Sequence, residues 1–136
     1  MIRAGARPQL VKDGFRGLEG PMPTPDGGLY FTALDENRIY KLDRDGKIAV
    51  WRENTNRTNG LYLLPDGRLL GAEGGGPRII AIAPGGAVTA LATGSGGKPL
   101  RGPNDLIPDR RGGIYFTDPG PRPAPDVAPK EPGSVY

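Results

Sequence analysis

Short runs of alternating apolar and polar residues recur along this chain, and residues typical of tight turns, mainly Gly, Pro and Asp, stand between them. Such a pattern predicts short strands joined by tight turns. Two consecutive stretches repeat one order of strand, strand, turn and strand. In the first they are Leu29–Ala33, Asn37–Leu42, Asp45–Gly46 and Ile48–Trp51, and in the second Leu69–Ala72, Arg78–Ala83, Gly85–Gly86 and Val88–Ala92. Each stretch is predicted to fold as an antiparallel meander.

These meanders belong to a longer repeat. Glu19, Asn59 and Asn104 each stand seven residues before a matching turn position, and they are spaced 40 and 45 residues apart. Periods of about 40 to 45 residues are typical of β-propeller blades, each a four-stranded antiparallel sheet. The sequence therefore predicts an all-β fold in which residues 1–136 form a partial β-propeller domain. Its blades are expected at about 18–57, 58–101 and 102–136.

The third blade is predicted to be incomplete. Ile114–Thr117 forms its strand, but residues 119–132 contain six prolines and are predicted to be a loop, because proline cannot donate a hydrogen bond to a strand ladder. Residues 133–136 then stand where 37–40 stand in the first blade. A closed propeller needs about four to eight blades. We therefore expect a fragment, or a chain that associates with itself through unfinished edges, for example as two copies joined head to tail.

Composition narrows the chemistry that the chain can perform. The 23 Gly and 16 Pro fit a fold with many turns, and the net charge of +3 is spread without the basic stripe of a nucleic-acid-binding protein. With no Cys and no His, thiol chemistry and the usual zinc ligands are excluded. No apolar stretch approaches the roughly 20 residues of a membrane span. We expect a cytoplasmic protein that contacts neither membrane nor nucleic acid; a periplasmic location would need an upstream signal.

The repeat also predicts a site. Because Glu19, Asn59 and Asn104 occupy one position in successive blades, their side chains are expected to converge on the central channel. A carboxylate with amide oxygens suits a hard cation, Ca²⁺ more readily than Mg²⁺. The alternative is that an Asn before Gly or Asp makes an Asx turn at the entrance to a strand. That alternative is most open for Asn59, which stands in Thr58-Asn59-Gly60.

Three further residues are candidates for binding a substrate. Glu73 precedes three glycines that leave room for a ligand or for a wide turn. Arg101 could reach an anionic substrate, or it could be a solvated cation of a loop. Asp118 ends a strand beside Pro119, where it could support the site or cap the loop.

The motifs together resemble the senescence marker protein, gluconolactonase and luciferin-regenerating-enzyme family, in its bacterial gluconolactonase-like branch. The resemblance spans roughly residues 9–119. It is carried by Leu18–Pro21, Asn37–Tyr40, Asp45–Lys47, Thr58–Leu61, Leu69–Glu73, Gly94–Leu100, Pro103–Asp105 and Tyr115–Pro119. It implies a six-bladed propeller with a divalent cation in its channel, usually Ca²⁺, with Zn²⁺, Mn²⁺ or Mg²⁺ as alternatives. One departure is Gly74–Gly76, where relatives often carry His-Gly-Asn.

By this resemblance Glu19 is a metal ligand, and Asn104 binds metal or substrate. Asn59, Glu73, Arg101 and Asp118 remain candidates for substrate contact from their own positions in the sequence. The resemblance implies two more ligands, an Asn and an Asp, and the Asp is also the general base; both would lie beyond Tyr136. The implied function is the N-terminal part of a metal-dependent lactone hydrolase that acts on a small sugar lactone. The alternatives are a non-catalytic propeller scaffold and an inactive truncated relic. We expect the isolated chain to be inactive or nearly so.

Overall fold

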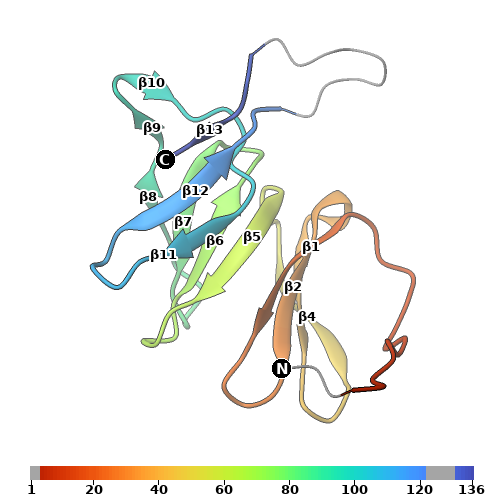
Figure 1. The fold of residues 1–136 in the computed structure, drawn as a ribbon. Helices are drawn as coiled ribbons and strands as arrows, with labels where there is room; N and C mark the ends of the chain where they lie inside the picture. The colour runs from red at the N-terminus through yellow and green to blue at the C-terminus, as the bar shows by residue number, and fades with distance from the viewer. Residues whose placement is uncertain (1–3, 122–130) are drawn as a thin grey trace.

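The computed structural model describes residues 4–121 and 131–136. Two four-stranded antiparallel meanders form its larger part (Figure 1). The first sheet consists of β1 (Leu18–Pro23), β2 (Leu29–Ala33), β3 (Arg38–Leu42) and β4 (Ile48–Glu53). The second consists of β5 (Thr58–Leu63), β6 (Leu69–Glu73), β7 (Arg78–Ile82) and β8 (Val88–Ala92). Strands follow one another in sequence order in both sheets, as the meander prediction required.

A third sheet of three strands follows, in the order β11 (Leu106–Pro108), β12 (Ile114–Asp118) and β13 (Ser134–Val135). Its last strand stands where the sequence placed the third strand of the repeat. Of the proline-rich segment, residues 122–130 lie outside the described part of the chain. Between the second and third sheets, β9 (Gly94–Ser95) and β10 (Lys98–Pro99) form a small hairpin that the periodicity did not predict. The all-β fold with four-stranded antiparallel sheets is confirmed.

One boundary differs from the prediction for a local reason. A short 3₁₀ helix, η1 (Leu34–Glu36), follows β2, and Asn37 ends it with a left-handed φ of 58°. A residue with this φ cannot continue into extended backbone, so β3 begins at Arg38 rather than at Asn37. The Asn37 side chain then accepts hydrogen bonds from Thr55 and from the backbone N–H of Arg57. This contact ties the first sheet to the segment that enters the second.

The sheets pack face to face through two apolar clusters. Between the first and second sheets lie Ile39, Leu61, Leu69, Ile80 and Ile82. Between the second and third lie Leu70, Ala72, Ile79, Ala81, Leu100, Leu106 and Phe116. Neighbouring residues of β6 and β7 enter opposite clusters, because successive side chains of a strand point to opposite faces. The inner strands β6 and β7 are therefore buried on both faces, and the second sheet forms the centre of the described structure.

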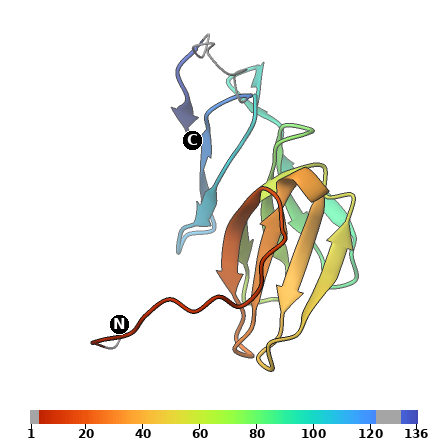
Figure 2. The same ribbon diagram turned by 90° about the vertical axis from the view of Figure 1, so that its right-hand side faces the viewer.

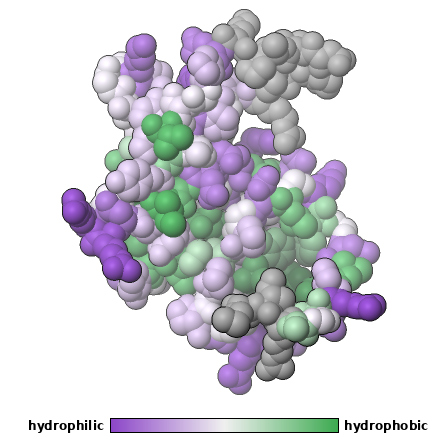
Figure 3. Space-filling view, in the orientation of Figure 1, coloured by the Kyte–Doolittle hydropathy of each residue, from purple (hydrophilic) through white to green (hydrophobic). Residues whose placement is uncertain are grey.

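The two outer sheets each have a face without a neighbouring sheet. On the third sheet, Ile107 and Tyr115 are 59% and 53% exposed and pair across β11 and β12. Hydrophobic atoms emerge among polar ones on this side of the molecule (Figure 3). Their exposure matches the position that the repeat assigns to contacts with a next blade.

On the first sheet, the N-terminal segment supplies a partial cover. It leads into β1 along the edge of this sheet (Figure 2), and its Phe15 packs edge-on against Phe31 and Tyr40, with ring centroids 5.2 and 5.0 Å apart. Glu36 fixes the segment, accepting hydrogen bonds from the Arg16 backbone N–H at 2.8 Å and the Tyr40 hydroxyl at 2.6 Å. These bonds, the tyrosine's first, hold the pKa of Glu36 below its ordinary value. Within the described residues, no helix is long and apolar enough to cross a membrane.

Replacing Phe15 with alanine is expected to lower the free energy of unfolding by about 1 to 2 kcal/mol, less than a fully buried Phe would cost because Phe15 is only half-buried. Urea denaturation followed by tyrosine and tryptophan fluorescence measures the change. Leu10→Ala is the control, since Leu10 is 80% exposed in the same segment. Equal, negligible effects of the two substitutions would show that the segment does not cover the sheet in solution.

Candidate functional site

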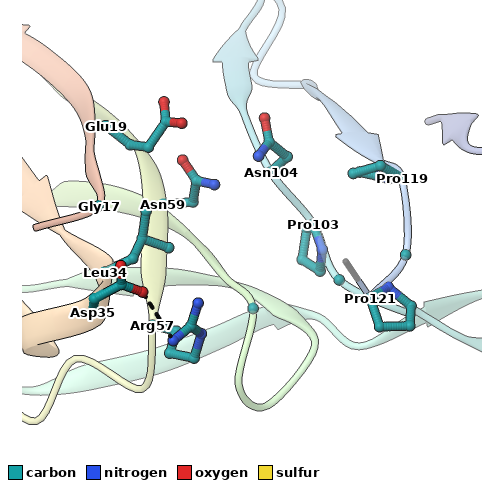
Figure 4. Close-up of a pocket in the computed structure, with 13 residues that line it drawn as sticks. Gly17, Glu19, Leu34, Asp35, Arg57, Asn59, Pro103, Asn104, Pro119 and Pro121 are labelled. Carbon is teal, nitrogen blue, oxygen red and sulfur yellow. Dashed lines mark ion pairs between the residues drawn. The ribbon is translucent and has the colours of Figure 1, made fainter. Parts of the chain in front are cut away.

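A cleft of about 580 Å³ opens where the three sheets approach one another (Figure 4). Glu19, Asn59 and Asn104 all line it. They come from β1, from β5 and from the segment before β11, and β5 lies against both β1 and β11. The repeat position singled out in the sequence therefore brings three oxygen-bearing side chains from three sheets to one cleft.

Backbone irregularities set the direction of two of these side chains. The pairing of β1 with β2 shifts register between Glu19 and Met22, and the pairing of β5 with β6 shifts at the equivalent place, between Thr58 and Leu61. An irregularity of this kind bends a strand and re-aims its side chains. In Figure 4, Glu19 and Asn59 point from adjacent strands into the same space. The same local distortion in two blades thus produces equivalent side-chain positions.

Close backbone approach between sheets explains the glycine that follows Glu19 and the one that follows Asn59. Gly20 has a φ of +54°, and a Cβ there would lie 2.5 Å from the carbonyl oxygen of Asn59. Gly60 donates its N–H to the Asn104 carbonyl at 2.7 Å. Any larger residue at either position would force the innermost strands apart. The glycines therefore fix the separation between neighbouring channel residues.

On the side of Glu19 and Asn59, the cleft also carries a pair of charges (Figure 4). Arg57 and Asp35 line it, with 3.5 Å between Arg57 Nη1 and Asp35 Oδ1. Both side chains are about half exposed, at 55% and 54%. Neither residue was a candidate from the sequence. A pointer was present, since Arg57 precedes the candidate Asn59 by two positions, as Gly17 and Gly102 precede Glu19 and Asn104.

Glu73 is not among the lining residues of the cleft. Its side chain is 3% exposed and accepts hydrogen bonds from Arg78 Nε at 2.9 Å and Arg78 Nη2 at 3.1 Å, and from the Asn56 amide. All of these contacts are internal. The structure therefore gives Glu73 an anchoring position between β6, β7 and the segment that enters β5.

Arg101 and Asp118 also have partners outside the cleft. The Asp118 carboxylate is buried and accepts the backbone N–H groups of Arg101 at 2.9 Å and Gly102 at 2.7 Å. The Arg101 guanidinium donates to Glu131 and to the carbonyl of Pro132. These bonds hold the segment before Asn104 against the end of β12 and the entry to β13. Both residues therefore support, from outside the cleft, the segment that carries Asn104.

The family model for the SMP-30/gluconolactonase/LRE-like region matches residues 18–136. This chain belongs to that family. The match covers all three sheets, and it confirms the resemblance drawn from the motifs. The comparison with curated protein sequences found no match.

Several solved structures share the fold of this chain. The gluconolactonase from Xanthomonas campestris is 31% identical with a TM-score of 0.79, over 93% of this chain and 45% of that one. A protein assigned as a gluconolactonase in a structural-genomics programme is 30% identical with a TM-score of 0.78, over 86% and 41%. A streptogramin B lyase is 25% identical with a TM-score of 0.64, over 77% and 35%. The chain thus spans less than half the length of each of these proteins.

In this member of the SMP-30/gluconolactonase/LRE-like family, the side-chain oxygen atoms that line the cleft are of the type that a hard cation prefers. Glu19 supplies carboxylate oxygens, and Asn59 and Asn104 supply amide oxygens, which are the donors that Ca²⁺ and Mg²⁺ prefer. In the described part of the chain no group of three or more His, Cys, Asp or Glu side chains is placed to hold a metal. Ca²⁺ takes six to eight oxygen ligands, so these three residues would form part of a coordination shell.

Proposed function

We propose that this chain is the N-terminal part of a divalent-metal-dependent lactone hydrolase of gluconolactonase type, with Ca²⁺ as the preferred ion. The observation that supports it most is the convergence of Glu19, Asn59 and Asn104 from three sheets on one cleft in a member of this family. Small-molecule sites are commonly concave, with a few polar groups at the bottom. A sugar lactone fits the volume and the polarity of such a cleft.

In this proposal Glu19 and Asn104 hold the cation, and Asn59 contacts metal or substrate. A bound divalent cation would polarise the lactone carbonyl and stabilise the negative charge that develops on its oxygen. The amide groups of Asn59 and Asn104 can each donate and accept hydrogen bonds, so they can orient the ring hydroxyls of the substrate. Pro103 and Pro119 line the far side of the cleft and offer no side-chain polar group. In this proposal the general base is the Asp that the family resemblance places beyond Tyr136.

Calcium titration tests the proposal without relying on turnover. Isothermal titration calorimetry of the purified chain is expected to show weak binding, roughly millimolar, because three side chains supply only part of the usual shell. Glu19→Gln is expected to weaken binding by about tenfold or more, since it removes the only charged oxygen donor of the set. Glu53→Gln is the control, because Glu53 is exposed and pairs with Arg38 away from the cleft.

Lactone hydrolysis by the purified chain as a monomer is expected to be very slow or undetectable. Equal calcium affinity in the wild type and in Glu19→Gln would contradict the metal assignment and favour the alternative of a non-catalytic scaffold. Calcium-dependent turnover by a proven monomer would show that these residues suffice for catalysis. That result would contradict the proposal that they form only part of the site.

A further inference from the structure

The charged wall of the cleft is absent from the other copies of the repeat. Shifting Arg57 by the repeat spacings of 40 and 45 residues gives Gly17 and Gly102, and all three positions line the cleft. The same shift takes Asp35 to Gly75 and then to Gly120. A blade of this protein can therefore be built with glycine at both positions. The pair of charges is a local addition to one side of the cleft.

Backbone geometry shows that the positions of Gly17 and Arg57 are equivalent. The N–H of Leu34 donates to the Gly17 carbonyl at 2.9 Å, and the N–H of Gly74 donates to the Arg57 carbonyl at 3.2 Å. Both acceptor residues have left-handed backbones, with φ of 66° at Gly17 and 57° at Arg57. Glycine adopts this conformation freely, whereas a residue with a Cβ is strained in it. Arginine thus stands where the backbone favours glycine, and strain retained in this way is characteristic of functional positions.

Contacts from two sheets hold the backbone of Arg57 in this strained position. The Asn37 side chain accepts its N–H at 2.9 Å, and Gly74 binds its carbonyl. The preceding residue, Asn56, donates to the buried Glu73. Among the residues that the structure describes, the guanidinium forms an ion pair with Asp35, at 3.5 Å. A fixed backbone therefore presents a half-exposed guanidinium at the cleft.

Arg57 is also the only cationic residue among those that line the cleft in the described part of the chain, where Glu19 and Asp35 are the acidic ones. Its five N–H donors form a planar fork that matches the oxygens of a carboxylate or a phosphate. Asp35 Oδ1 lies 3.5 Å from its Nη1 atom. We propose that Arg57 binds an anionic oxygen group of the ligand in this cleft, a carboxylate or a phosphate carried by a polyhydroxylated acid or its lactone.

This inference rests on the proposed function, because it names the chemical class of ligand for the same cleft. Hydrolysis of a lactone turns a neutral ester into a carboxylate, so an anion recognised by Arg57 has two sources. It is either the carboxylate that ring opening releases or an anionic substituent at the far end of the substrate. The guanidinium chemistry is the same for both.

The test is an NMR titration of the ¹⁵N-labelled chain with EDTA present, so that it does not depend on metal. The probes are glucitol, gluconate and 6-phosphogluconate, which share a six-carbon hydroxylated chain. We expect gluconate or 6-phosphogluconate, but not glucitol, to shift the signals of the Arg57 side chain and of Gly74. Shifts with gluconate identify the released carboxylate, and shifts with 6-phosphogluconate alone identify a remote anionic group.

Arg57→Gly is the most informative variant, because it places at position 57 the glycine that stands at the equivalent position 17. It is expected to fold normally and to bind the anion about fivefold more weakly, in line with the modest strength of half-exposed ion pairs. Arg57→Lys should retain part of the affinity, and Asp35→Asn should increase it by removing a competing carboxylate. Arg44→Gln is the control, since Arg44 is exposed beside Asp45 in a turn.

Two results would overturn the inference: equal shifts with glucitol and with the anions, or unchanged anion affinity in Arg57→Gly. Either could occur while calcium still binds through Glu19, in which case the proposed metal site would stand and the anion site would fall. Anion binding at Arg57 in a chain that binds no calcium would support the anion site and overturn the proposed metal site.

Discussion

Gly60→Ala is expected to destabilise the chain by about 3 kcal/mol, the sum of overpacking at a rigid contact and a weakened hydrogen bond. A Cβ at Gly60 would lie 2.7 Å from the Cα of Asp105 and 2.9 Å from the carbonyl oxygen of Asn104. Both atoms belong to the backbone, so no rotation of a side chain relieves the clash. β5 would have to move away from the segment before β11 and stretch the 2.7 Å bond from Gly60 to Asn104.

Urea denaturation measures this loss, with Gly85→Ala as the matched control. Gly85 lies in the turn between β7 and β8, and a Cβ there meets nothing within 4 Å. The control is expected to change stability by less than about 0.5 kcal/mol, as for most surface substitutions. If Gly60→Ala were as mild as the control, the second and third sheets would not approach each other as closely as the structure shows.

The same substitution should also weaken the proposed calcium site, because it moves Asn104 away from Asn59. Calorimetry of Gly60→Ala under folding conditions is expected to show lower affinity for calcium than the Gly85→Ala control. A destabilised variant with unchanged calcium affinity would mean that Asn104 does not act together with Glu19 and Asn59.

The placement of Glu19, Asn59 and Asn104 on one cleft was predictable because a repeat gives equivalent residues equivalent positions. No long-range information was needed beyond the spacing and the number of strands per blade. The same logic predicted that β13 would continue the third sheet, from the match between residues 133–136 and 37–40. Periodicity thus supplied the fold and the centre of the site.

Residues that depart from the repeat were harder to interpret. Glu73 precedes a run of glycines, for which the sequence left open room for a ligand or a wide turn. In the structure Gly75 and Gly76 lie against Asn56, where a Cβ would come within 3 Å of its side chain. The glycines therefore make room for the chain's own Asn56. The other two blades have glycine at the position of Arg57, and the value of Arg57 as a candidate depends on its left-handed φ, which a sequence does not reveal. Such positions require the three-dimensional contacts.

Glu73→Ala is expected to cost about 2 to 3 kcal/mol of stability. Breaking a fully buried ion pair costs about 3 to 5 kcal/mol, and the figure is lower here because the side chain of Arg78 is 38% exposed and can reach water. The substitution removes both bonds from Arg78 and the one from Asn56. Glu73→Gln should cost less, about 1 to 2 kcal/mol, since it retains an acceptor oxygen for one partner. Thermal or urea unfolding provides the measurement.

Glu53→Ala is the control for Glu73→Ala, because Glu53 also pairs with an arginine, Arg38, but its side chain is 59% exposed. Exposed pairs of this kind contribute about 0 to 1 kcal/mol, so a comparable loss in the two variants would contradict the buried, bidentate geometry. Glu73 also anchors Asn56, the neighbour of Arg57. Glu73→Ala should therefore lower both stability and anion affinity, whereas Arg57→Gly should lower anion affinity alone. This contrast distinguishes Glu73, which supports the site, from Arg57, which binds the anion.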